Sequence, residues 1–169
     1  MKVNWKELLA RFQGKRVLKY GVYMFLALLC QNMLFTQLRI LGVCPMVLPA
    51  VAIAVGMFEG SSWGAVFGLI LGIFADMAYI ENTILFTVAF PALAFAAGVV
   101  VHFFVNRRFF AFMGVAALGL LIMAFLQMMG TFARDSWSSA LLLTAVLQAL
   151  WSLPFAAPAY VLPARWIHN

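Results

Sequence analysis

Charged side chains are scarce in this chain of 169 residues: Asp, Glu, Lys and Arg make up 9% of it, and 66% of the residues are hydrophobic. Soluble domains normally contain about 25% charged residues, so the composition excludes a water-soluble globule. One membrane-embedded bundle would use nearly the whole length, and a second soluble domain needs at least about 50 residues. We therefore expect no appended domain for nucleotide or sugar chemistry.

Cysteine and the residue sets of common catalytic sites are also scarce. Cys30 and Cys44 are the only cysteines, without zinc-binding spacing and without a dense disulfide pattern. The sequence has no HExxH motif, no phosphate-binding loop, no Ser/His/Asp or Cys/His set and no paired carboxylates at a common depth. His102 stands near the end of a hydrophobic run, where an interface role is more usual than a ligand role. We expect no enzymatic activity, no cofactor and no bound metal.

Hydrophobic runs fill most of the chain. Cutting the sequence at charged residues leaves six uncharged runs, at 20–38, 40–58, 60–75, 82–106, 109–133 and 136–164. A helix of about 20 apolar residues crosses the hydrocarbon core, and the third run reaches this length if its helix extends from about Ser62 to Ile80. We predict an all-α polytopic membrane bundle of six transmembrane helices, with short loops that make neighbouring helices antiparallel.

Basic residues determine the predicted orientation. Six of the eleven precede the first run, which indicates a topology signal and attraction to anionic lipid rather than nucleic-acid binding. With the N-terminus inside and six crossings, nine basic residues are cytoplasmic and two are outside, so both termini are predicted to be cytoplasmic. A re-entrant hairpin made of the second and third runs would give the same charge count and stays open. The topology anchors next to the membrane are Lys15, Arg16, Lys19, Arg107 and Arg108.

Three segments follow from this topology. Residues 1–19 are predicted to form a basic, cytoplasmic interfacial helix that ends near Gly14, because apolar residues recur in it at helical spacing beside basic ones. Residues 20–164 form the transmembrane bundle, and residues 165–169 form a cytoplasmic tail too short for a domain.

Prolines interrupt the last hydrophobic run, at Pro154, Pro158 and Pro163. A proline in a helix interior removes one backbone hydrogen bond and clashes with the preceding turn. We therefore expect a regular helix only from about Trp137 to Leu153, followed by a bend or a break.

A stripe of small residues is the most informative pattern in the sequence. Glycine recurs at every fourth position from residue 56 to residue 72, and Asp76 follows four residues after the last of these glycines. This spacing places positions without side chains along one helix face, to which another helix can pack closely. That helix can belong to this bundle or to a partner, and close approach of a small ligand is a third interpretation. The candidate packing or partner interface comprises Gly60, Gly64, Gly68, Gly72 and Asp76.

Polar side chains inside the runs are few. A carboxylate such as Asp76 should face the protein interior or a water-filled cavity. Proton or cation coupling needs a second polar partner, and no other acidic residue lies within a predicted span, so we favour a hydrogen-bonded residue at a helix end. Gln31, Asn32, Gln127 and Gln148 are expected to make interhelical hydrogen bonds or to line a small polar pocket.

The stretch 26–76 resembles the MreD family of bacterial rod shape-determining proteins. It reads LALLCQNMLFTQLRILGVCPMVLPAVAIAVGMFEGSSWGAVFGLILGIFAD: an apolar helix with a glutamine, a turn with glycine and proline, a hydrophobic helix, and a Gly-x3-Gly series that ends in a carboxylate. Chain length, helix number and the basic pair after the fourth run agree as well. The matching residues are Gln31, Gly42, Pro45, Glu59, Gly60, Gly64, Gly68, Gly72 and Asp76.

The resemblance implies a non-enzymatic, multi-pass protein of the bacterial cytoplasmic membrane that helps to maintain rod shape. Its implied partners are an MreC-like single-span protein, the MreB filament and the cell-wall synthases, and self-association into homo-oligomers is a further expectation. The alternative is the substrate-binding membrane subunit of an energy-coupling-factor vitamin transporter, which is similar in size and helix number. A tightly bound small molecule would favour the transporter, and a co-purifying single-span protein with a large outer domain would favour the shape protein.

Overall fold

The computed structural model describes residues 14–35, 37–38, 43–78, 84–103, 109–132 and 139–167. Within these residues, every element of regular secondary structure is a helix. The elements are α2 (Gly14–Cys30), a π-helical turn η1 (Gln31–Phe35) that continues it, α3 (Leu48–Glu59), α4 (Ser61–Ala78), α5 (Leu85–Phe103), α6 (Phe109–Phe132) and α7 (Ser139–Ile167). The predicted all-α class is therefore confirmed.

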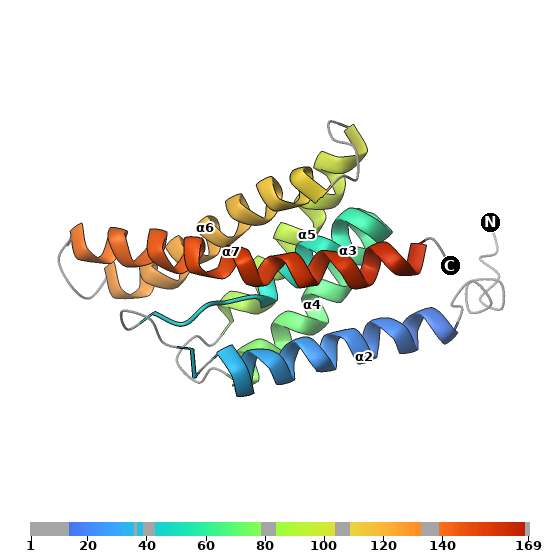
Figure 1. Cartoon of the computed structure of the whole chain (residues 1–169), viewed down its shortest axis with the longest axis horizontal. Helices are drawn as coiled ribbons and strands as arrows, with labels where there is room; N and C mark the ends of the chain where they lie inside the picture. The colour runs from blue at the N-terminus through green and yellow to red at the C-terminus, as the bar shows by residue number, and fades with distance from the viewer. Residues whose placement is uncertain are drawn as a thin grey trace.

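Five segments are long and apolar enough to cross a membrane: Val17–Phe35, Ser61–Ala78, Leu85–His102, Phe109–Met129 and Leu142–Val161. Their outward faces carry large apolar side chains, which water would not tolerate at this density but lipid does. The five helices indicate a multi-pass membrane protein. α2 begins and α7 ends at the same end of the bundle (Figure 1).

The second hydrophobic run does not form the single spanning helix expected for residues 40–58. Residues 43–47 have no helical structure, and the helix that follows, α3, has only 12 residues, or about 18 Å at 1.5 Å per residue. Prolines explain the difference. Pro49 occupies the first turn of α3, where a missing N–H is harmless, whereas Pro45 disfavours a helix before it.

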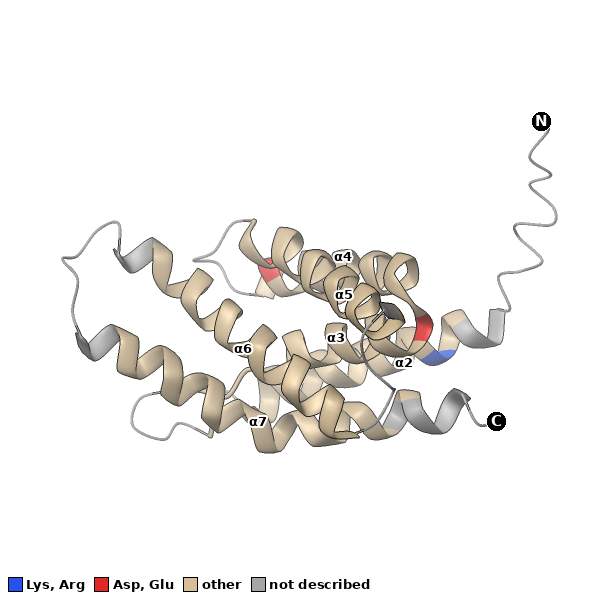
Figure 2. Cartoon of the chain, turned by 90° about the horizontal axis from the view of Figure 1, so that it is seen from above, with Lys and Arg blue, Asp and Glu red and all other residues tan. Residues whose placement is uncertain are grey.

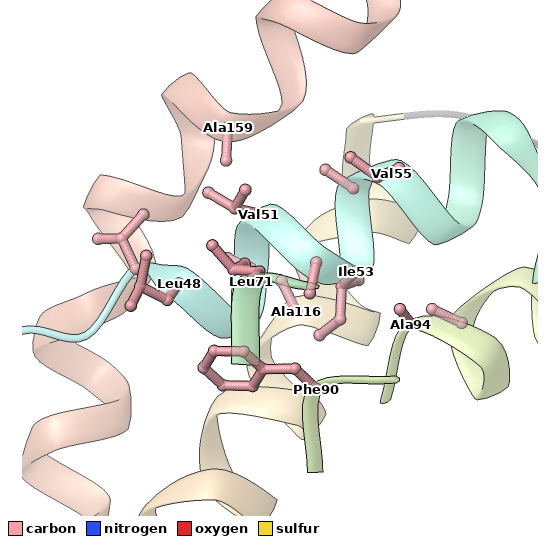
Figure 3. Close-up of a cluster of buried hydrophobic side chains, with 14 of the residues drawn as sticks. Leu48, Val51, Ile53, Val55, Leu71, Phe90, Ala94, Ala116 and Ala159 are labelled. Atoms are coloured by element: carbon pink, nitrogen blue, oxygen red, sulfur yellow. The ribbon is translucent and has the colours of Figure 1, made fainter. Parts of the chain in front are cut away.

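The short helix α3 is the centre of the bundle. Eleven of its residues, Leu48–Phe58, are buried, and it contacts α2, α4, α5, α6 and α7. A helix that is apolar all round is suited to such a position. Figure 3 shows side chains of this core, with Val51, Ile53 and Val55 of α3 among residues from α4, α5, α6 and α7.

The last helix is continuous, and the break expected after Leu153 is wrong. α7 runs to Ile167 through all three prolines. Pro163 has no N–H to donate to the carbonyl of Ala159, four residues earlier. The hydroxyl of Tyr23 on α2 donates a hydrogen bond to this carbonyl oxygen at 2.8 Å, so this buried acceptor is not left unpaired.

The helix boundaries at the two ends differ from the predicted segments. α2 begins at Gly14, so Lys15, Arg16 and Lys19 lie in the first helix of the bundle and not in a separate interfacial helix. Most of the predicted interfacial helix, residues 1–13, lies outside the described residues. The end of α7 includes the first three residues of the predicted tail, 165–167.

The pairing of Tyr23 with the proline-freed carbonyl predicts an energetic coupling between Tyr23 and Pro163. Tyr23→Phe should lower the free energy of unfolding by about 1 kcal/mol, because it leaves a buried acceptor unpaired. Pro163→Ala restores a backbone N–H to the helix, and in that background the cost of Tyr23→Phe should fall by about half or more. Unfolding titrations in mixed micelles of the two single variants and the double variant measure the coupling; strictly additive effects would contradict this account of α7.

Candidate functional site

The glycine stripe of α4 lies against α5. A Cβ atom built on Gly68 would come 2.8 Å from the backbone carbonyl carbon and oxygen of Phe90, and one built on Gly72 would come 2.7 Å from the Cα atom of Thr87. One on Gly64 would meet the backbone of Gly56 on α3. Glycines of α4 that are four residues apart therefore meet positions of α5 that are also four residues apart, in the opposite order along the chain. Helices α4 and α5 make the most extensive contact in the bundle.

Gly60 has a different role from the other glycines of the stripe. It lies between α3 and α4 with a φ of 97°, a left-handed conformation that L side chains rarely adopt. Nothing lies within 4 Å of a Cβ atom built on it. Gly60 therefore permits the chain to reverse direction between the two helices and is not part of the packing face.

Asp76 holds the start of α5. Its Oδ1 atom accepts a hydrogen bond from the backbone N–H of Phe86 at 3.1 Å, and its Oδ2 atom accepts from the N–H of Thr87 at 2.8 Å and the Thr87 hydroxyl at 2.6 Å. The first N–H groups of a helix have no partner within the helix and favour negative charge. Asp76 thus supplies, from the end of α4, the cap that α5 lacks in its own sequence.

The glycine face and Asp76 together form an interface within the chain. Since the backbone of α5 lies against Gly68 and Gly72 and the backbone of Gly56 on α3 lies against Gly64, a partner's helix has no access to this face. Figure 2 shows the two acidic residues of the described part well apart. Glu59 lies just before α4 and Asp76 near the end of α4, so they do not form a carboxylate pair.

A second polar arrangement surrounds the non-helical residues 43–47. The side chain of Gln31 is buried in the π-helical turn of α2. Its Nε2 atom donates to the carbonyl oxygen of Pro45 at 3.0 Å, and its Oε1 atom accepts from the N–H of Val47 at 2.9 Å. One amide side chain therefore replaces the two backbone partners that a helix or a strand would have provided.

Side chains from α6 and α7 complete the arrangement. The hydroxyl of Ser152 accepts from the N–H of Met46 at 2.8 Å and donates to the carbonyl oxygen of Gln148 at 2.7 Å. The Nε2 atom of Gln148 donates to Oε1 of Gln127 at 3.2 Å, and Nε2 of Gln127 donates to the sulfur of Met46 at 2.8 Å. We call Gln31, Gln127, Gln148 and Ser152 the polar cluster.

The structure separates the predicted polar residues into two groups. Gln31, Gln127 and Gln148 all belong to the polar cluster, although they come from three different helices. Asn32 points away from the bundle and is exposed. Of the predicted topology anchors, Arg107 and Arg108 lie outside the described residues.

The chemistry of the polar cluster is neutral. It consists of amides and a hydroxyl that donate and accept hydrogen bonds without a formal charge, so it can hold backbone or a small polar molecule. Among the residues that the structure describes, no group of three or more His, Cys, Asp and Glu side chains could hold a metal ion. The arrangement is suited to fixing a chain segment inside the bilayer, where water cannot satisfy the backbone.

Three contributing residues were not singled out from the sequence. The Ser152 hydroxyl accepts a hydrogen bond from the N–H of Met46. The Tyr23 hydroxyl donates one to a carbonyl oxygen of α7, and the Tyr20 hydroxyl donates one to Glu59 at 2.5 Å. A signal for Ser152 was available, because it follows Gln148 by one helical turn and so shares its face. Tyr20 and Tyr23 likewise lie on the face of α2 that carries Gln31.

Comparisons with known proteins returned no match to this chain, whether with protein-family models, with curated proteins or with solved structures.

The polar cluster predicts a large difference between two adjacent substitutions. Gln31→Leu should lower the free energy of unfolding by about 1–3 kcal/mol, because the carbonyl of Pro45 and the N–H of Val47 lose their partner inside the bundle. Asn32→Leu is the matched control and should change it by no more than about 0.5 kcal/mol, since Asn32 is exposed. Unfolding titrations in mixed micelles give both values, and equal effects would show that Gln31 does not hold residues 43–47.

Proposed function

We propose that this protein is a non-enzymatic membrane component of the bacterial cell-elongation machinery, related in function to the MreD proteins that its sequence resembles. The observation that carries the proposal is that residues behind the resemblance make contacts that join neighbouring segments of the bundle, in two separate arrangements. Gln31 pairs with Pro45, Gly60 permits the turn, and the glycines and Asp76 join α4 to α5.

We propose that residues 43–47 and α3 together make the second of six crossings. Residues 43–47 and the 12 helical residues of α3 together can reach at most about 34 Å, which is enough for the hydrocarbon core of about 30 Å. This path places six crossings between the start of α2 and the end of α7, which lie at one end of the bundle (Figure 1). The positive-inside rule then puts this end in the cytoplasm.

In this proposal the protein acts through its outward-facing surface. Because α3 and α5 cover the glycine face, the transmembrane helix of an MreC-like partner must meet a lipid-facing helix instead. α2 is the least buried of the five long apolar helices, and its outer face is open around Gly21. MreB, the cell-wall synthases and a second copy of the chain are further proposed partners, together with anionic lipid at the basic N-terminal segment.

The alternative function is that of a substrate-binding subunit of a vitamin transporter. The observation in its favour is the interrupted crossing at residues 43–47, because transporters often bind substrates beside discontinuous helices. The cavity next to this segment has a volume of about 10 Å³, far below the 300 Å³ or so at the lower end for ligand pockets. Because this cavity is too small for a vitamin, we favour the scaffold function over the transporter function.

Purification from a rod-shaped bacterium in native lipid discs tests the proposal. We expect mass spectrometry to identify a single-span protein with a large outer domain and cell-wall synthases, and we expect depletion of the protein to turn rods into spheres. A stoichiometric vitamin together with ATPase subunits would overturn the proposal in favour of the transporter. Gly68→Leu is unsuitable as an interface probe because its side chain would collide with the backbone of Phe90; substitutions on the outer face of α2, such as Val22→Trp, leave the core intact.

A further inference from the structure

A small cavity lies beside the polar cluster, where α6 and α7 meet the non-helical residues. Its volume is about 10 Å³, and its polar lining comes from Gln127, Gln148 and Ser152, with the sulfur-containing side chain of Met46. The rest of the lining is apolar. A buried water requires about 10–15 Å³ of such space, so the cavity matches one water molecule and excludes organic ligands and hydrated ions.

Gln127 and Gln148 can make more hydrogen bonds than the ones that they make to each other and to Met46. A side-chain amide offers two N–H donors and an oxygen with two lone pairs. Gln127 uses one donor and one lone pair, and Gln148 uses one donor. Within the described part of the chain, the Oε1 atom of Gln148 receives no hydrogen bond. Leaving such groups unmatched inside an apolar bundle is costly.

We infer that this cavity binds a single water molecule, which donates to the amide oxygen of Gln148 and accepts from the second N–H of Gln127. A bound water typically makes two to four hydrogen bonds, and these two groups supply the minimum. A bare cation fits less well, because the glutamines contribute N–H donors as well as oxygens at this point. The water would tie α6 and α7 together beside Met46, so that a hydrated network supports the non-helical residues. This inference is independent of the proposed function.

The test uses the full chain, with glutamine labelled with nitrogen-15, in lipid bilayers. Magic-angle-spinning NMR with transfer of magnetisation from water should give cross-peaks to the side-chain amides of Gln127 and Gln148. The amide of Gln31 is the internal control, because it is buried and does not line the cavity, and it should give no such peak. Absence of water contact at Gln127 and Gln148 would overturn the inference.

A variant that fills the cavity separates bound water from water at the membrane surface. Ala124 is buried and lines the cavity, so Ala124→Val should remove the cross-peaks to Gln127 and Gln148 and leave the Gln31 region of the spectrum unchanged. Persistent cross-peaks in a folded Ala124→Val protein would place the water outside the cavity and overturn the inference. Should this variant fail to fold, the wild-type comparison with Gln31 still decides whether water reaches the cluster.

Discussion

Every backbone N–H and C=O group inside a bilayer must find a partner in the protein, and the rest of this structure depends on that constraint. Helices α2 and α4 to α7 satisfy it internally along most of their length. Residues 43–47 do not, because Pro45 disfavours the helix that the hydrophobic run would otherwise form before α3. The polar cluster resolves this conflict: Gln31 and Ser152 pair with three backbone groups of the segment. In the same way, Tyr23 satisfies the carbonyl that Pro163 leaves unpaired in α7.

These polar contacts also explain how a helix as weakly covered as α2 stays in place. Lipid tails can replace apolar contacts between helices at little cost in free energy, so hydrogen bonds and close backbone packing decide which helices associate in a membrane. α2 relies on hydrogen bonds, from Tyr20 to Glu59, from Tyr23 to α7 and from Gln31 to residues 45 and 47. The pair of α4 and α5 relies on the glycine face and the Asp76 cap instead. The bundle therefore uses two different means of helix association.

The sequence predicted the helical class, most helix positions and the residue types that would make interhelical contacts. Hydropathy could not show that residues 43–47 of the run 40–58 are not helical, because an apolar run is equally apolar in either conformation. Gln31 could not be distinguished from Asn32, since the two differ only in the direction they face on α2 and no charge marks the buried side. The continuity of α7 was missed because its compensating donor, Tyr23, lies 136 residues from Ala159. Asp76 was correctly placed at a helix end, but the helix that it caps became visible only in three dimensions.

Hydrogen–deuterium exchange at the amides of Met46 and Val47, in lipid nanodiscs, tests most directly whether side chains hold the non-helical segment inside the bundle. The account predicts that both amides exchange as slowly as those in the middle of α6, although neither belongs to a helix. It also predicts that Gln31→Leu speeds exchange at Val47 more than at Met46, because Ser152 still accepts from Met46. Fast exchange at both amides in the wild-type protein would contradict the account, since it would show that water and not the polar cluster satisfies this backbone.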